Sequence, residues 1–346
     1  MKRPNSPLRA ACLAATLSWL AGTAAAQVPA SSAAPAAATA PGEAGSTPTQ
    51  LVDALNGVFG KHAGARAVHA KGIVLEGTFT PAAGAHAISK APHLQKASVP
   101  VVVRFSNFAG IPDIPDNHAL ASPRGFAIKF LLPDGSASDI VAHSFNGFPS
   151  PTADDFRDLL IALGKSGPDA PKPTPLDAYL ADHPVAKAFL TAPKPAPVSY
   201  ASLPYYGVNT FKFTNAAGKV IYGRYQFVPV AGAHYLDDAQ TAKAAPDYLQ
   251  KEIAERVKQG PLRFRLMLQL AQAGDKLDDP SIAWSDTRRR VELGTITISK
   301  LDEDNAAAQK RLLFLPAALP AGIEPADPMI TARSAAYPVS FARRQK

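Results

Sequence analysis

Two short segments carry residues whose types and spacing could do chemistry. The first reads Arg66-Ala-Val-His69-Ala-Lys-Gly72 and runs into a strand-like stretch. A histidine titrates near neutral pH and can act as a general base, and a neighbouring glycine lets another group approach the backbone closely. Taken alone, the segment also fits a structural histidine whose ring is satisfied by hydrogen bonds.

The second segment lies near the end of the chain and reads Arg333-Ser-Ala-Ala-Tyr337-Pro-Val-Ser-Phe-Ala-Arg-Arg344. On a helix, Arg333, Tyr337 and Arg344 share one face, although Pro338 makes the helix irregular. Guanidinium groups beside a phenol favour the phenolate, which can ligate iron. The alternative is a terminal helix with a solvated arginine face and a buried tyrosine.

Composition excludes several other classes of protein. The chain has 346 residues and a single cysteine, Cys12, so it has neither an internal disulfide framework nor a cysteine-based zinc or iron–sulfur site. The formal charge of +8 is scattered along the chain, which argues against nucleic-acid binding. Glycine-rich nucleotide loops, H-E-x-x-H and G-x-S-x-G are absent from the sequence.

The first 26 residues predict a secretory signal peptide. Three basic residues precede an apolar run from Ala10 to Leu20, which is too short to span a bilayer, and Ala24-Ala25-Ala26 offers a cleavage site. Cleavage removes Cys12, which suits an oxidising compartment, and a bacterial periplasm is the first choice. An uncleaved anchor is the alternative.

Three regions are therefore expected: the signal peptide at 1–26, a flexible linker at 27–48 rich in alanine and proline, and a single domain at 49–346. No later apolar run approaches 18 residues, so no membrane span is expected in the mature protein.

The hydrophobic pattern of the domain predicts strands first and helices later, which favours an α+β fold around an antiparallel sheet or barrel. A hairpin is expected around the turn Asn215-Ala-Ala-Gly218. The expected strands are Gly72–Phe79, Val99–Phe105, Gly125–Leu132, Thr210–Asn215, Lys219–Val230 and Arg290–Ser299. The expected helices are a short one around Leu51–Phe59, then Asp154–Leu163, Leu176–Thr191, Ala245–Ala273 and a segment from about Pro328.

Taken together, the two segments and three others resemble the haem catalase superfamily, specifically its short catalase-related peroxidases. The resemblance runs from about Leu51 to Arg344. Its ordered signatures are Arg66–Gly72, Val103–Ser106 with Pro123–Phe130, Asp139-Ile-Val141 leading to Asp154-Asp155-Phe156, Tyr206–Lys212, and Arg333-x-x-x-Tyr337-Pro after Phe314-Leu-Pro316 and Pro320-Ala-Gly322.

This resemblance implies a catalase-like, eight-stranded antiparallel β-barrel with surrounding helices, and a haem pocket closed by the C-terminal helix. It also implies the chemical roles. His69 would be the distal base, taking a proton from peroxide and returning it to the leaving oxygen. Tyr337 would be the axial ligand of the haem iron, and Arg333 would hold it ionised.

Further residues match positions around the cofactor. Arg66, Arg104 and Arg344 match arginines that pair with the haem propionates, where the alternative is surface salt bridges. Ser106 matches a residue that supports the distal histidine. Phe156 matches an aromatic residue near the haem face and Phe148 one that lines the distal pocket; for these the alternative is core packing. The implied cofactor is haem, of the b type.

One position departs from the family pattern. Large catalases carry a distal asparagine that helps to orient peroxide, and a gapless alignment places His143 in that column. The nearest asparagine is Asn146, which a shifted loop could deliver. Either outcome puts efficient dismutation of peroxide in doubt, but not cleavage of its O–O bond by His69.

The resemblance also ends shortly after Tyr337, which implies an accessible haem and therefore organic reductants. The expected function is a haem-dependent peroxidase that reduces H2O2 through a ferryl intermediate with small organic donors, with weak catalase activity. The alternatives are a haem enzyme acting on organic or lipid hydroperoxides and a non-catalytic periplasmic haem-binding protein. The oligomeric state and the physiological reductant do not follow from the sequence.

Overall fold

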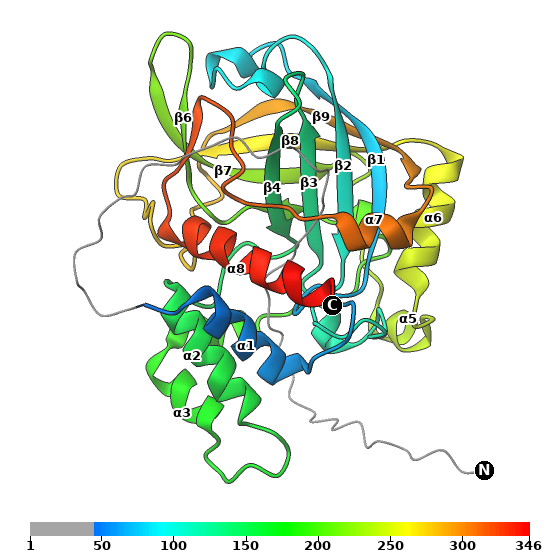
Figure 1. The fold of residues 1–346 in the computed structure, drawn as a ribbon, viewed down its shortest axis with the longest axis vertical. Coiled ribbons are helices and arrows are strands. Elements are labelled where there is room, and N and C mark those ends of the chain that lie inside the picture. The colour runs from blue at the N-terminus through cyan, green and yellow to red at the C-terminus, as the bar shows by residue number, and fades with distance from the viewer. Residues whose placement is uncertain (1–44) are drawn as a thin grey trace.

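Eight strands close into an antiparallel barrel in the computed structural model, which describes residues 45–346 (Figure 1). Neighbouring strands pair in the order β7-β5-β4-β3-β2-β1-β9-β8, and β8 returns to β7. β6 and β10 extend the sheet beside β7. The strands are β1 Gly72–Pro81, β2 Val99–Ser106, β3 Gly125–Leu131, β4 Ala137–His143, β5 Tyr205–Tyr206, β6 Phe211–Thr214, β7 Val220–Pro229, β8 Leu262–Leu270, β9 Arg290–Leu301 and β10 Ile323–Pro325.

The inside of the barrel is an apolar core. Side chains alternate between the two faces of a strand, so on β2 Val103 and Phe105 enter this core while Arg104 points to the outer face. Phe126 on β3 lies at its centre, with its ring 4.3 Å from Phe227 and 5.3 Å from Phe264 between centroids. Aromatic packing of this kind stabilises the barrel from its interior.

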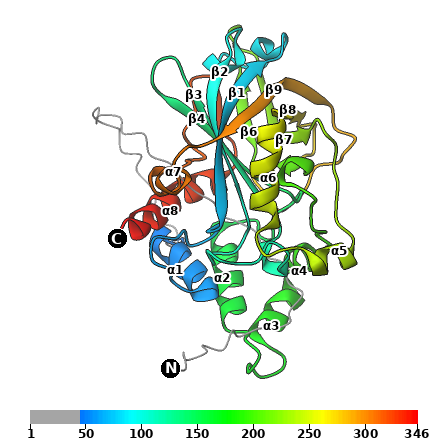
Figure 2. The same ribbon diagram turned by 90° about the vertical axis from the view of Figure 1, so that its right-hand side faces the viewer.

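Helices cover one outer side of the barrel (Figures 1 and 2). α8 crosses in front of β2–β4, α7 lies beside β1, and α1 packs against both α8 and α2. These helices and the outward-facing residues of β1, β3 and β4 form a second apolar cluster. The helices are α1 Pro48–Phe59, α2 Ala153–Gly164, α3 Pro175–Asp182, α4 Pro184–Thr191, α5 Asp238–Lys243, α6 Tyr248–Gln259, α7 Asn305–Arg311 and α8 Pro328–Arg344.

Local sequence explains where the two helices nearest the site begin. Thr47 caps α1 in a reciprocal capping box with Gln50. α8 begins with Pro328 at its first turn, and the Asp327 carboxylate accepts a hydrogen bond from the Met329 N–H. The helix then continues through Pro338 to Arg344, so Arg333, Tyr337 and Arg344 lie on one element.

Most of the expected elements are confirmed, including the barrel and the hairpin of β6 and β7, whose turn is closed by Asn215 and Lys219. Two predictions are wrong in part. The expected helix Ala245–Ala273 ends at Gln259, because Gly260-Pro261 interrupts it, and Leu262–Leu270 alternates buried and exposed residues as β8. Leu176–Thr191 is two helices, divided at Pro184.

The predicted signal peptide at 1–26 and most of the predicted linker at 27–48 lie outside the described residues and stay predictions. Within residues 45–346, no helix combines the length and the apolar character that crossing a membrane requires.

Candidate functional site

His69 is held rigidly at the entrance to β1. It is 3 % exposed, and its backbone has a φ of +54°, a left-handed conformation that side-chain-bearing residues rarely adopt. The surroundings fix it there: its N–H donates to Phe108 O at 2.6 Å, and its carbonyl accepts from Arg104 Nη2 at 3.0 Å. Such backbone strain costs about 1–3 kcal/mol and persists only where the surrounding contacts hold the residue in place, which is common at functional sites.

The ring of His69 is positioned by the register of β1, β2 and β3. Gly72 lies opposite Ser106, and Ser106 opposite Gly125. Ser106 Oγ is 3.0 Å from His69 Nδ1. A Cβ on Gly125 would lie 2.4 Å from Ser106 Oγ and 2.7 Å from His69 Nδ1, so only glycine leaves room for this pair.

The electrostatics keep the His69 imidazole neutral. Burial, followed by the positive charges of Arg104 and Arg333, lowers the pKa of His69 well below its ordinary value. The ring is therefore unprotonated at neutral pH, which is the state that a proton acceptor needs.

The second predicted pair meets on α8. Arg333 donates to the phenol oxygen of Tyr337 from Nε at 3.0 Å and from Nη2 at 2.8 Å. Its Nη1 donates to Asn209 Oδ1, and Asn209 Nδ2 donates to Asp327 Oδ2 at 2.7 Å. Burial raises the pKa of Asp327 to about 6. Two guanidinium N–H groups aimed at one phenol oxygen favour its ionised form.

The remaining predicted arginines form a buried cluster of positive charge. Arg66, Arg104 and Arg344 are each 5 % exposed or less. Burial, then Arg104 and Arg344, lowers the pKa of Arg66 well below its ordinary value, so the three guanidinium groups lie within electrostatic reach of one another. Buried Arg104 Nη1 and Arg344 Nε have no hydrogen-bond partner among the described residues. Buried guanidinium N–H groups without a partner indicate a site that an anionic group could occupy.

Apolar side chains join the two halves of the site. Val68, Phe148, Phe156 and Tyr337 belong to the same buried cluster on the outer side of the barrel. Phe148 and Phe156 pack with ring centroids 5.0 Å apart. His69 and Arg333 approach this cluster from opposite elements, the start of β1 and the middle of α8.

The structure separates the two candidates for a second distal group. His143 ends β4 opposite Gly125, is 2 % exposed, and lies close enough to His69 for the two rings to interact electrostatically. Its Nδ1 accepts from the Phe145 N–H at 3.2 Å, which leaves the proton of the neutral ring on Nε2. Asn146 is half-exposed and makes no hydrogen bond with the described residues.

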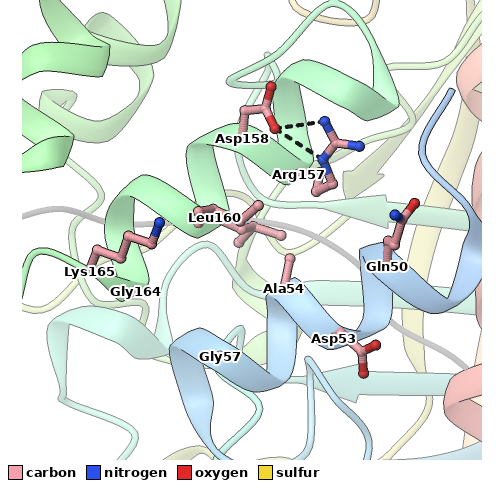
Figure 3. Close-up of a pocket in the computed structure, with 10 residues that line it drawn as sticks. Gln50, Asp53, Ala54, Gly57, Arg157, Asp158, Leu160, Gly164 and Lys165 are labelled. Carbon is pink, nitrogen blue, oxygen red and sulfur yellow. Dashed lines mark hydrogen bonds and ion pairs between the residues drawn. The ribbon is translucent and has the colours of Figure 1, made fainter. Parts of the chain in front are cut away.

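A separate cavity of about 600 Å³ lies between α1 and α2 and contains none of the predicted site residues (Figure 3). Small residues, among them Gly57 and Gly164, leave the space, and Arg157 pairs with Asp158 at its rim. It is distinct from the site built around His69 and Tyr337.

Comparison with known proteins agrees with this geometry. A family model described as catalase matches residues 25–345. The chain belongs to the catalase family. Two proteins named catalase-related peroxidase are similar along nearly their whole length. That of Mycolicibacterium paratuberculosis is 38% identical, over 87% of this chain and 95% of its own; that of Synechococcus elongatus is 33% identical, over 87% and 90%.

Larger catalases match over part of their length. Catalase-2 of Bacillus subtilis is 29% identical, over 79% of this chain and 42% of its own. Among solved structures, a bacterial catalase superposes with a TM-score of 0.72 at 23% identity, covering 82% of this chain and 58% of that one. A fungal catalase gives 0.72 at 22%, covering 85% and 62%. These structures share the fold of the barrel and its helices.

Catalases use haem, and the residues present fit that group. Haem needs an axial ligand for iron and cations for two propionates. The Arg333–Tyr337 pair would supply the first, and the guanidinium atoms of Arg104 and Arg344 that lack a partner would supply part of the second. The buried aromatic residues of the same cluster would supply an apolar wall.

The structure brings together the site residues that the sequence singled out, except Asn146, and it adds two. Asn209 orients Arg333, and Gln309 on α7 accepts hydrogen bonds from Arg66 and Arg104. Asn209 lies inside the signature Tyr206–Lys212, so the sequence motif could have identified it as a site residue. Gln309 lies in a short alanine-rich helix outside every signature.

Gly125→Ala is expected to lower the free energy of unfolding by about 1–3 kcal/mol, because the new Cβ overlaps Ser106 and His69. Urea unfolding measures this loss, and NMR of the His69 ring reports its displacement. Gly84→Ala, where a Cβ meets nothing within 4 Å, is the matched control. A Gly125→Ala protein with unchanged stability and an unchanged His69 spectrum would contradict the close approach.

Proposed function

We propose that the protein is a haem peroxidase that reduces H2O2 with electrons from small organic donors and has minor catalase activity. The observation that carries this proposal is the presence of two prepared groups in one site. His69 is neutral and is held by Ser106, and the phenol oxygen of Tyr337 receives two N–H groups from Arg333. Two relatives named catalase-related peroxidase, each aligned over at least 90% of its length, support it.

In this proposal Tyr337 would hold the iron, and Arg66, Arg104 and Arg344 would bind the propionates of a b-type haem. When bound, haem would supply the redox centre that passes electrons from the organic donor to the peroxide. Arg333 stabilises the negative charge on Tyr337 Oη through the two N–H donors.

The proton transfers belong to His69. When His69 donates Nδ1–H to Ser106 Oγ, its Nε2 carries the lone pair. Nε2 takes the proton from one oxygen of H2O2 and returns it to the other, so that the O–O bond can break with water as the leaving group. The two electrons for this reduction would come from the haem and, in turn, from the organic donor. The strained backbone and the contact with Gly125 prevent the ring from turning away during the transfer.

His143 is proposed as the second distal group, because its Nε2–H donor comes from the same end of the barrel as His69. Burial, followed by electrostatic interaction with His69 and Arg333, lowers the pKa of His143 well below its ordinary value, so the ring is neutral at pH 7. A bulky imidazole where large catalases carry an asparagine favours one peroxide per cycle, and therefore donor oxidation over dismutation.

Tyr337→Phe is expected to remove the phenolate ligand. The haem-loaded variant should show a shifted Soret band and should bind haem at least about tenfold more weakly, because the charged iron–oxygen bond is lost. Tyr235→Phe, at an exposed position, is the control and should match the unmodified protein. An unshifted Soret band in Tyr337→Phe would rule out this residue as the ligand.

His69→Ala is expected to slow the H2O2-dependent oxidation of a chromogenic phenol by about 10²–10⁴-fold, because the proton shuttle is lost. In the unmodified protein the rate should fall on the acid side only well below pH 6.5, since the His69 base is lost only when pH drops through its lowered pKa. Exposed His86→Ala is the control. If His69→Ala keeps the full rate, the protein binds haem without this chemistry.

His143→Ala is expected to reduce peroxide turnover by at least about tenfold, and Asn146→Ala by less than about twofold, because only His143 is buried beside His69. Oxygen release and phenol oxidation measured in parallel separate the catalase and peroxidase routes. The same assay with cumene hydroperoxide tests organic peroxides as the substrate. Equal losses in the two variants would count against the assignment of His143.

A further inference from the structure

Gln309 lies where the arginine cluster meets the surface of the barrel. Its Oε1 accepts from Arg104 Nε at 3.0 Å and Nη2 at 2.9 Å, and from Arg66 Nη1 at 3.4 Å. Its backbone carbonyl accepts from Arg66 Nη2 at 2.8 Å. One residue of α7 thus sets the orientation of two guanidinium groups that come from different parts of the chain.

The amide of Gln309 cannot reverse. Its Nε2 donates to Gly72 O at 2.7 Å, so Oε1 must face the arginines. Gly72 is also the residue at which a Cβ would lie 2.4 Å from Arg104 Nη2. The glycine therefore lets Gln309 and Arg104 approach each other over the start of β1.

The acceptors that Arg104 meets are neutral. They are the carbonyls of His69 and Ala70 and the amide oxygen of Gln309, and no carboxylate of the described residues lies within salt-bridge distance of Arg104. Burial and the charge of Arg344 lower the pKa of Arg104 to about 9, which still leaves it charged at neutral pH. Gln309 therefore holds this cation without neutralising it.

A charged residue could be accommodated at position 309. Gln309 is half-buried and lines an open groove of about 660 Å³, together with Arg66, Gly72 and Gln250. A carboxylate there would reach the same two guanidinium groups and pair with them. The amide leaves their charge for another anion.

We propose that Gln309 is a positioning residue that orients Arg104 and Arg66 toward the carboxylates of the cofactor and, by being neutral, leaves the positive charge of Arg104 available to bind them. The inference rests on the proposed use of haem. It predicts that charge at position 309, and not only hydrogen bonding, decides how firmly haem is held.

The test compares two substitutions of similar size in the full-length protein. Gln309→Glu keeps oxygen acceptors beside the arginines and adds a charge, whereas Gln309→Met removes both. Haem release to excess apomyoglobin should be at least about tenfold faster from Gln309→Glu than from the unmodified protein, and faster than from Gln309→Met. Without haem, the order should reverse, with the melting temperature of Gln309→Glu above that of Gln309→Met.

Gln250→Glu is the matched control, because Gln250 Nε2 also donates to Gly72 O, at 3.2 Å, without a hydrogen bond to Arg66 or Arg104. It should release haem within about twofold of the unmodified rate. If Gln309→Glu holds haem as well as or better than Gln309→Met, Gln309 is only a structural bridge and the proposal is wrong. Equal acceleration by Gln250→Glu would also overturn it. Failure of the unmodified protein to bind haem would refute the proposed function instead.

Discussion

The site depends on the burial of four guanidinium groups in one layer between the barrel and its helices. Arg66, Arg104, Arg333 and Arg344 are each 5 % exposed or less, and the acceptors that they meet include amide, carbonyl and phenol oxygens. Removing a cation from water costs several kcal/mol unless an anion compensates it. The layer is therefore held in a state of high positive potential by the rest of the fold. The proposed dianionic cofactor, with Tyr337 ionised, would relieve that potential, so the same residues that cost stability would favour an anionic ligand.

The barrel supplies the rigidity that this layer needs. Its interior is filled by aromatic and aliphatic side chains that do not touch the site, so packing stability and chemistry lie on opposite faces of the same strands. Arg104 and Phe105 show the arrangement in two consecutive residues. At the end of the barrel, the register places Ser106, Gly125 and His143 in one row across β2, β3 and β4. A shift of one residue in any of these pairings would turn the row to the other face and dismantle the distal side.

Much of the site followed from the sequence because its parts are local. The spacing of Arg333 and Tyr337 on a helix, and the approach of His69 to a strand, each depend on a few neighbouring residues. The features that the sequence did not predict depend on residues that are farther apart in the chain. The sequence of β8 resembles a continuation of α6 unless Gly260 and Pro261 are taken to end the helix. The proposal of His143 over Asn146 rests on the pairing of β3 with β4. Gln309 could not be found at all, because its importance comes from Arg66 and Arg104, more than 200 residues away in the chain.

The continuity of α8 through Pro338 has a geometric consequence. Tyr337 and Arg344 are seven residues apart on one unbroken helix, which sets them about 10 Å apart along its axis and on nearly the same side. The proposed iron ligand and one proposed carboxylate anchor thus lie on the same helix, at a separation that the helix pitch sets. If both roles hold, this separation would have to match the distance from the centre of the cofactor to its acid side chains. A tetrapyrrole with shorter or displaced acid side chains would then meet Tyr337 or Arg344 but not both.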